Sequence, residues 1–470
     1  MTTARLACMV AAAAALAGCV GFGNSPPASP LGASDMPPAW AEPGAADAAA
    51  LTRNWWRAFG STELSVLVDA ALHASPDAVI AAERVRQAEA QARSAGATLF
   101  PALNLGAGTG RRETRPHEGR WSGEDSSSAA LSASYEIDLW GRNAAGVRSA
   151  EASLRATRFD EETVRLTLAS GVASGYFQVL ALRGRLAIAR DNLMIAERVF
   201  KVVDARVRHG AASPLDLARQ QAAVLALRAS IAPLEQQERQ TLNALAILTG
   251  RSPEGFAAAG TGVNALAVPR VAPGLPAQLL VRRPDLASAE AQLASANANV
   301  AAARAALLPG ISLTGSAGLA SPVLINFLHA PTAAVALGAS LLQPIFDGGR
   351  LRAQLDAAAS RERELVENYR RSVLAALADV EDALVAAGRT ADQEALQAQV
   401  LEQARIALRL AEIRYREGVD DQLGVLDAQR TLFQAEDQLA QIRLARLQAS
   451  VGLFKALGGG WEVNGRIAGA

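Results

Sequence analysis

The chain has 470 residues, enough for two or three ordinary domains, and its 46 Lys or Arg residues balance its 46 Asp or Glu residues. This balance gives no reason to expect nucleic acid or an anionic surface as the main partner. Aromatic residues make up only 4% of the chain, while alanine dominates the apolar half. Such a composition is typical of long, closely packed helices and excludes a large aromatic-rich globular core.

Residues 1–18 have the pattern of a signal peptide, with Arg5 ahead of an apolar stretch. The segment ends in Leu-Ala-Gly before Cys19, and this tetrapeptide resembles the lipobox of bacterial lipoproteins, in which the Cys is acylated and becomes the first residue. Val20 rather than Asp follows, which by the same resemblance favours the outer membrane. We therefore expect lipidation at Cys19. The alternative is an ordinary secretory signal with an incidental Cys.

Residues 19–53 are rich in Pro, Gly, Ala and Ser, which predicts a tether from the lipid to the folded body. The first ordered part begins at residue 54, where Trp55 and Trp56 are expected to pack in a core. Ser61 is a good helix cap ahead of an apolar-periodic segment. A helix over about 77–99 should follow.

Two segments then alternate between apolar and polar residues, about 102–111 and 129–138, with a polar segment between them that is expected to be an exposed loop. Strands of about ten alternating residues around a polar loop match an outer-membrane β-hairpin. The alternative is the edge of a β-sandwich in a soluble protein.

From residue 141 to residue 209 no Pro interrupts a helical pattern, which corresponds to a helix on the order of 100 Å long. A helix of that length must pair with other long helices, since it cannot fold back into a globular core. The segment 210–214 is the expected turn, and a second helix should return to residue 249. The first repeat therefore spans 54–250, and the Pro- and Gly-rich segment 251–276 is a linker.

Residues 277–458 repeat the same organisation at an offset of 208 residues, with strands at about 310–319 and 334–342 and a tail at 459–470. The offset is seen at five pairs of landmarks: Pro76 and Pro284, Pro101 and Pro309, Arg142 and Arg350, Gly210 and Gly418, Gly250 and Gly458. Gene duplication is the simplest explanation, and it predicts two similar halves packed side by side.

Residue patterns that suggest enzyme chemistry are weak in this chain. Gly106, Gly108 and Gly110 follow a strand, but no helix begins after them, as a dinucleotide-binding loop would require. The four His have no metal-ligand spacing, and no Ser sits in a nucleophile elbow. We therefore expect no enzyme activity, no cofactor and no metal site, and we read Asp347-Gly348-Gly349-Arg350 as a strand-to-helix turn.

Together these segments resemble the TolC-like outer-membrane efflux protein family, in its lipoprotein branch serving resistance–nodulation–division (RND) pumps. The motifs that carry the resemblance are LAGC at 16–19, WW at 55–56 with Phe59, RRPD at 282–285 with AE at 289–290, LP at 308–309 with SLTG at 312–315, PIFDGGR at 344–350, RYREG at 414–418 and VLDAQR at 425–430. The resemblance spans about residues 55–457.

The resemblance implies a mainly α fold with a membrane β-barrel, made of two tandem repeats of long antiparallel coiled-coil helices and four β-strands per protomer. A homotrimer would close them into a 12-stranded β-barrel and a periplasmic α-barrel. Elementary physics agrees, because four strands cannot close alone and an open sheet edge in lipid is forbidden. The implied location is the cell outer membrane, lipid-anchored and extending into the periplasm.

The function implied is the outer-membrane channel of a tripartite efflux system, a passive exit duct for drugs or other small toxic compounds. Its partners would be a periplasmic adaptor protein, an inner-membrane RND transporter and outer-membrane lipid, with no nucleic acid. The alternatives are a duct for metal ions or an exported protein, or a structural coiled-coil lipoprotein without a pore.

The turns at Gly210 and Gly418 are expected to form the periplasmic tips that dock the adaptor, although both glycines could simply end helices. Leu423, Asp427 and Arg430 are spaced i, i+4 and i+7 and so share one helical face. The family implies a periplasmic gate at these positions, with an acidic ring around the threefold axis. The alternative is a solvated Asp beside an Arg that pairs along the helix.

Overall fold

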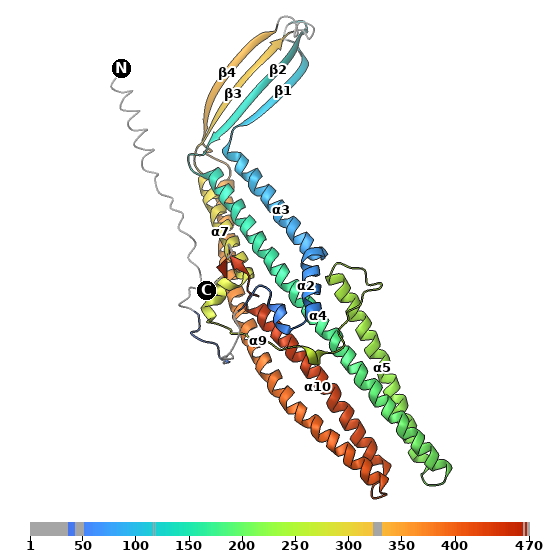
Figure 1. The fold of residues 1–470 in the computed structure, drawn as a ribbon. Helices are drawn as coiled ribbons and strands as arrows, with labels where there is room; N and C mark the ends of the chain where they lie inside the picture. Colours follow the sequence, from blue (N-terminus) through green and yellow to red (C-terminus); the bar gives the residue numbers. More distant parts are fainter. Residues whose placement is uncertain are drawn as a thin grey trace. The chain divides into compact units, whose positions relative to one another are not determined.

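The computed structural model describes residues 36–42, 51–115, 117, 119–322, 331–463 and 466–467. The predicted signal peptide and Cys19 lie outside these residues. The helices are α2 (Thr62–Ala74), α3 (Pro76–Gly96), α4 (Arg142–Arg208), α5 (Pro214–Leu248), α6 (Leu279–Arg282), α7 (Pro284–Ala305), α9 (Arg350–Arg416) and α10 (Gln422–Ala456). The strands are β1 (Ala102–Thr114), β2 (Ser122–Ile137), β3 (Gly310–Ser321), β4 (Thr332–Leu342), β5 (Glu462–Val463) and β6 (Arg466–Ile467), and Figure 1 shows the main elements.

The chain divides into two compact units. The described part of unit 1 lies within 88–155 and 290–369 and holds β1–β4, whereas unit 2 holds the remaining described residues, including α5, α10 and the distal parts of α4 and α9. Each unit contains segments from both predicted repeats. The repeats are therefore intertwined, and they do not fold as separate domains.

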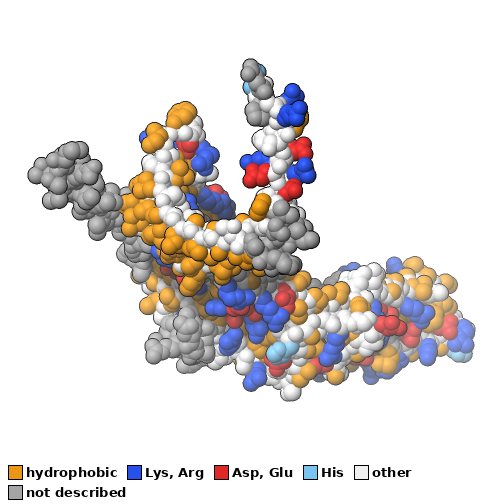
Figure 2. Space-filling view, turned by 90° about the horizontal axis from the view of Figure 1, so that it is seen from above, with side chains coloured by type: hydrophobic (Ala, Val, Ile, Leu, Met, Phe, Trp, Pro, Cys, Tyr) orange, Lys and Arg blue, Asp and Glu red, His pale blue; other side chains and the backbone are white. Residues whose placement is uncertain are grey.

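Unit 1 is built on an antiparallel sheet in the order β1-β2-β3-β4. One row across the sheet pairs Leu105 with Leu131, Leu131 with Ala317 and Ala317 with Val335. Because side chains alternate between the faces of a strand, this row and its like-facing neighbours give the sheet one apolar face. Figure 2 shows the sheet as an open arc with hydrophobic side chains along its outer side.

The opposite face of the sheet carries small polar side chains. The neighbouring row pairs Asn104 with Ser132, Ser132 with Ser316 and Ser316 with Ala336. Hydroxyl groups also meet across strands on this face, as in the 2.7 Å contact between the Oγ atoms of Ser312 and Ser340. The predicted alternation is confirmed, and β1 and β4 are the two edge strands, each paired on one side.

The first hairpin is longer than the sequence pattern predicts. The ladder between β1 and β2 continues to the Thr114–Ser122 pair, so most of the segment expected to be a loop is a two-stranded ribbon. Its charges pair locally, since Arg111 Nε lies 3.2 Å from Glu113 Oε1 and 4.0 Å from Asp125 Oδ1. Charged residues that are polar on both faces have no alternating pattern, and for this reason the strand signal was missed.

The helices reproduce the predicted repeat. Both α4 and α9 have 67 residues, and both α5 and α10 have 35. The backbone of Gly250 approaches Ala74 so closely that an added Cβ would lie 2.2 Å from its carbonyl oxygen. The equivalent contact joins Gly458 to Arg282, again 208 residues along, where the added Cβ would lie 2.0 Å from the carbonyl oxygen. A side chain at either position would collide with backbone, which explains glycine at both.

Unit 2 has an aromatic core between the repeats. Trp55 stacks on Phe454 with ring centroids 5.0 Å apart, and Phe59 lies 4.9 Å from Phe177. Trp55 and Trp56 are both buried, which confirms their predicted core role, and Ser61 caps α2 by accepting a hydrogen bond from the Leu64 amide.

Parts of the predicted tether and tail are ordered against unit 2. The indole of Trp40 donates to the Gly274 carbonyl at 2.8 Å, and Glu42 pairs with Arg389 on α9 at 3.2 Å. At the other end Trp461 is buried and packs edge-on against Phe159, with ring centroids 5.5 Å apart. Tryptophan side chains bury large apolar areas, and each one fastens a segment whose composition alone indicates flexibility.

Candidate gate and docking tips

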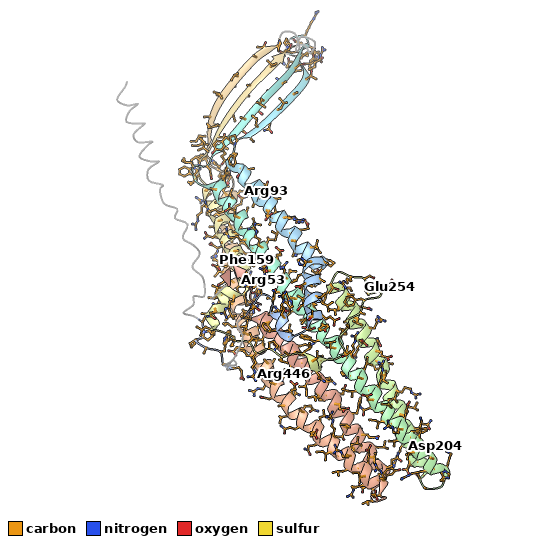
Figure 3. The ribbon with its side chains drawn as sticks, viewed as in Figure 1. Arg53, Arg93, Phe159, Asp204, Glu254 and Arg446 are labelled. Carbon is orange, nitrogen blue, oxygen red and sulfur yellow. The ribbon has the colours of Figure 1, made fainter. Side chains whose placement is uncertain are left out.

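The first hairpin, formed by α4 and α5, turns at Gly210. This residue has φ 72°, and the Ala211 amide donates to the Arg206 carbonyl at 2.8 Å, which ends α4 with a left-handed residue. Ser213 then caps α5 in a reciprocal arrangement with Asp216, and Pro214 occupies the first turn. Near this end of α4, Asp204 pairs with Arg208 at 2.9 Å (Figure 3).

The second hairpin, formed by α9 and α10, turns in the same way at Gly418, which has φ 73°. Here the turn carries an additional ion pair, with Arg414 Nε 2.5 Å from Asp420 Oδ2 and Arg414 Nη2 3.2 Å from Asp420 Oδ1. This hydrogen bonding lowers the pKa of the Asp420 carboxyl and raises the pKa of the Arg414 guanidinium. The predicted tips are therefore true helical turns, and Gly210 and Gly418 are their left-handed residues.

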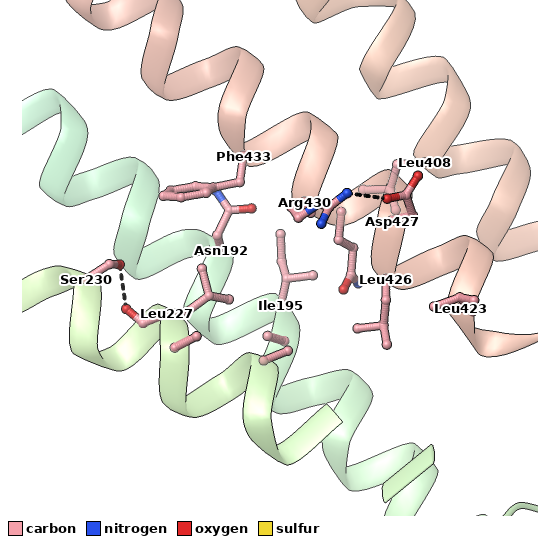
Figure 4. Close-up of a pocket in the computed structure, with 14 residues that line it drawn as sticks. Asn192, Ile195, Leu227, Ser230, Leu408, Leu423, Leu426, Asp427, Arg430 and Phe433 are labelled. Carbon is pink, nitrogen blue, oxygen red and sulfur yellow. Dashed lines mark hydrogen bonds and ion pairs between the residues drawn. The ribbon is translucent and has the colours of Figure 1, made fainter. Parts of the chain in front are cut away.

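The three predicted gate residues lie together near the beginning of α10. Arg430 Nη2 is 2.8 Å from Asp427 Oδ1, and both side chains are well exposed, at 71% and 64%. Leu423, Asp427 and Arg430 line one cavity with residues of α4, α5 and α9 (Figure 4). The shared helical face predicted from their spacing is thus present. Arg219, which occupies the position equivalent to Asp427 in the first repeat, is also exposed.

Three contacts between the hairpins were not predicted from the sequence. The Arg206 guanidinium lies over the Tyr415 ring, 4.8 Å from its centroid, and joins the two turns. Further from the turns, Gln422 Nε2 donates to Gln220 Oε1 at 3.1 Å in a buried hydrogen bond.

The third contact is a two-point ion pair, in which Arg185 Nε is 2.6 Å from Asp437 Oδ1 and Arg185 Nη2 is 3.1 Å from Asp437 Oδ2. The partners of this pair are 252 residues apart in the chain. No local pattern could have indicated such a pair.

Within the described residues, no group of three or more His, Cys, Asp or Glu side chains could hold a metal ion. Across the same residues no single helix is long and apolar enough to cross a membrane. One bent pair, α2 with the segment 76–99, meets that requirement by length and composition alone.

The family model described as outer membrane efflux protein matches the chain twice, at residues 67–251 and 275–459. The second match begins and ends 208 residues after the first, as the sequence repeat predicts. A curated relative, the pyoverdine export outer membrane protein OpmQ of Pseudomonas aeruginosa, is 45% identical over 419 residues, covering 87% of this chain and 88% of the relative. OpmQ of Pseudomonas putida is 43% identical over 473 residues, covering 99% of each chain.

Solved structures share the fold. A membrane protein from Pseudomonas aeruginosa superposes with a TM-score of 0.84 at 31% identity, covering 93% of this chain and 100% of that one. The open state of the MtrE outer membrane channel of Neisseria gonorrhoeae gives a TM-score of 0.82 at 29% identity, covering 91% and 96%. The paired family matches, the relatives and the shared architecture agree, and the chain belongs to the outer membrane efflux protein family.

Proposed function

We propose that three copies of this chain form the passive exit duct of a tripartite efflux system. As a member of its family, the protein is an outer membrane component of an efflux system. The proposal adds that the duct is a homotrimer, that it works with a periplasmic adaptor and an inner-membrane RND transporter, and that Cys19 carries a lipid.

The observation that carries the proposal is the two-faced, curved sheet of unit 1. Its outer face presents large apolar side chains to the surroundings, with Leu105 78% exposed and Leu337 88% exposed. Its other face is small, polar and suited to water. The edge strands β1 and β4 have unpaired sides in a single chain, and an unpaired edge in lipid leaves backbone groups unsatisfied at several kcal/mol each. Pairing β4 of one copy with β1 of the next, around a threefold axis, removes every edge.

The cargo we propose is a small organic molecule. The two OpmQ relatives are named for pyoverdine export. Relatives at 32–34% identity are named for efflux of solvents, toluene or antibiotics. These names favour drugs or other small organic compounds over metal ions or an exported protein.

We place the gate at Asp427, with Leu423 and Arg430 beside it. In a trimer, three Asp427 carboxylates ~8 Å apart would repel one another by about 2 kcal/mol per pair at an effective dielectric constant of ~20. The 2.8 Å contact with Arg430 offsets this repulsion within each copy. The balance holds the tips together weakly enough for the adaptor to open them.

Two measurements test the proposal. Native mass spectrometry of the purified protein should give a complex of three 48.8 kDa chains, less the signal peptide and plus the lipid. The Asp427→Ala, Arg430→Ala variant should show single-channel conductance several-fold above wild type. A monomer by mass would contradict the trimer, and an intact mutant trimer with unchanged conductance would place the gate elsewhere.

A further inference from the structure

A cavity of about 390 Å³ lies in unit 2 between the hairpin of α4 and α5 and the hairpin of α9 and α10 (Figure 4). Its wall is mostly apolar and is formed by Ile195 of α4, Leu227 of α5, Leu408 of α9, and Leu426 and Phe433 of α10. The volume falls within the range of small-molecule sites, about 300–1,000 Å³. Side chains from all four helices meet here, so an occupant would touch both hairpins at once.

The wall also contains polar groups that suit a particular ligand. Gln429 Nε2 is buried and finds no acceptor among the described residues, although it lines the cavity. A buried donor without a partner is unfavourable, and a ligand oxygen would relieve it. Asn192, in contrast, is already satisfied, because its side-chain amide donates to the Ile188 carbonyl at 2.8 Å.

The charged pair at the wall favours a cation over an anion. Asp427 and Arg430 are exposed, and such pairs are held weakly. The short Asp427 side chain keeps its carboxylate at the cavity, whereas the long, flexible Arg430 side chain can turn into solvent and leave the carboxylate to another cation. An anion paired with Arg430 would stay beside the Asp427 carboxylate and be repelled by it.

We propose that this cavity binds a small amphiphilic organic cation. Its apolar body fills the space between Leu227, Leu426 and Phe433, an ether, carbonyl or hydroxyl oxygen accepts from Gln429 Nε2, and its ammonium group pairs with Asp427. Because Asp427 also belongs to the proposed gate, such a ligand would influence opening. That consequence rests on the proposed function, whereas the binding itself does not.

The test uses a matched pair of fluorescent probes, 2-(1-naphthyloxy)ethylammonium and (1-naphthyloxy)acetate, which share the aryl ether and differ in charge. Binding is measured by fluorescence anisotropy on the full-length protein in lipid nanodiscs, with empty nanodiscs as the blank. We expect the ammonium probe to bind wild type at least tenfold more tightly than the acetate. Asp427→Asn should remove this preference.

Ala223 lines the cavity and Ala222 beside it does not, which offers a matched pair of variants. Ala223→Phe should weaken binding of the ammonium probe at least tenfold, while Ala222→Phe should bind it like wild type. Equal affinity of wild type for both probes, or equal binding by the two Phe variants, would overturn the inference. If Ala223→Phe does not fold, Asp427→Asn still decides the matter. Conductance of the wild-type protein without any probe separately tests the proposed function.

Discussion

The ion pair between Arg185 and Asp437 should hold the two hairpins of one chain together. It joins α4 to α10 through two contacts of 2.6 and 3.1 Å, and its side chains are 22% and 20% exposed. Two unit charges ~4 Å apart attract by about 4 kcal/mol at an effective dielectric constant of ~20. Desolvation removes part of this energy, and hydrogen bonds to charged groups contribute about 1.5–3 kcal/mol net.

We therefore expect a coupling energy of about 2 kcal/mol between the two side chains, which corresponds to roughly a 30-fold change in an equilibrium between closed and open tips. The assay is a double-mutant cycle of Arg185→Gln and Asp437→Asn, with the open probability of single channels in planar bilayers as the readout. Each single variant should open far more often than wild type, and the double variant little more than either.

The matched control is the pair of Arg190 and Glu235, which joins α4 to α5 within the first hairpin at 2.7 Å. Its side chains are more than half exposed, so the pair is worth about 0–1 kcal/mol and does not connect the hairpins. Arg190→Gln should leave the open probability unchanged. A coupling energy below about 0.5 kcal/mol for Arg185 and Asp437, or an equal effect of the control, would refute the reasoning.

Three further predictions follow from the sheet and the tips. Gly210→Val and Gly418→Val place a β-branched residue at a left-handed position, at a cost of at least about 1–2 kcal/mol, and each should abolish efflux while trimers still assemble; normal export by both would contradict the docking role. Leu105→Arg on the apolar face should lower membrane insertion by about 2–4 kcal/mol, whereas Ser132→Arg on the polar face should insert like wild type, as measured by the yield of membrane-embedded trimer; equal yields would contradict the assignment of the faces. The pKa of Asp420 is lowered, so its contribution to the second turn is present above its ordinary pKa of about 3.9 and is lost as the pH falls through the lowered value. Hydrogen exchange of residues 417–422 should therefore be slower in wild type than in Asp420→Asn at pH 5 and equal at pH 2; equal exchange at both values would exclude the contribution.

The long hairpins could be predicted because their signals are local. A helix without Pro is a continuous pattern, and Gly210 and Gly418 stop the two helices at positions where only a left-handed residue closes the turn. The apolar and polar faces of the sheet could be predicted for the same reason. Alternation over ten residues is independent of what lies across the strand.

What could not be predicted depends on residues that are distant in the chain. The ribbon at Arg111 is a strand because its charges meet partners on β2, and Trp461 is buried because Phe159 offers it a surface. The cavity beside Asp427 exists because the two hairpins leave space between them. Each of these features comes from tertiary packing, which a pattern along one segment does not contain.

The central claim is that this protein forms an open-ended duct through the outer membrane, and the most direct measurement is ion conductance of the purified wild-type protein in a planar lipid bilayer. We expect discrete steps of equal size, small at rest because the tips are closed, and several-fold larger for Asp427→Ala with Arg430→Ala. A correctly folded trimer that inserts into the bilayer and passes no current, in wild type and in the double variant alike, would contradict the account.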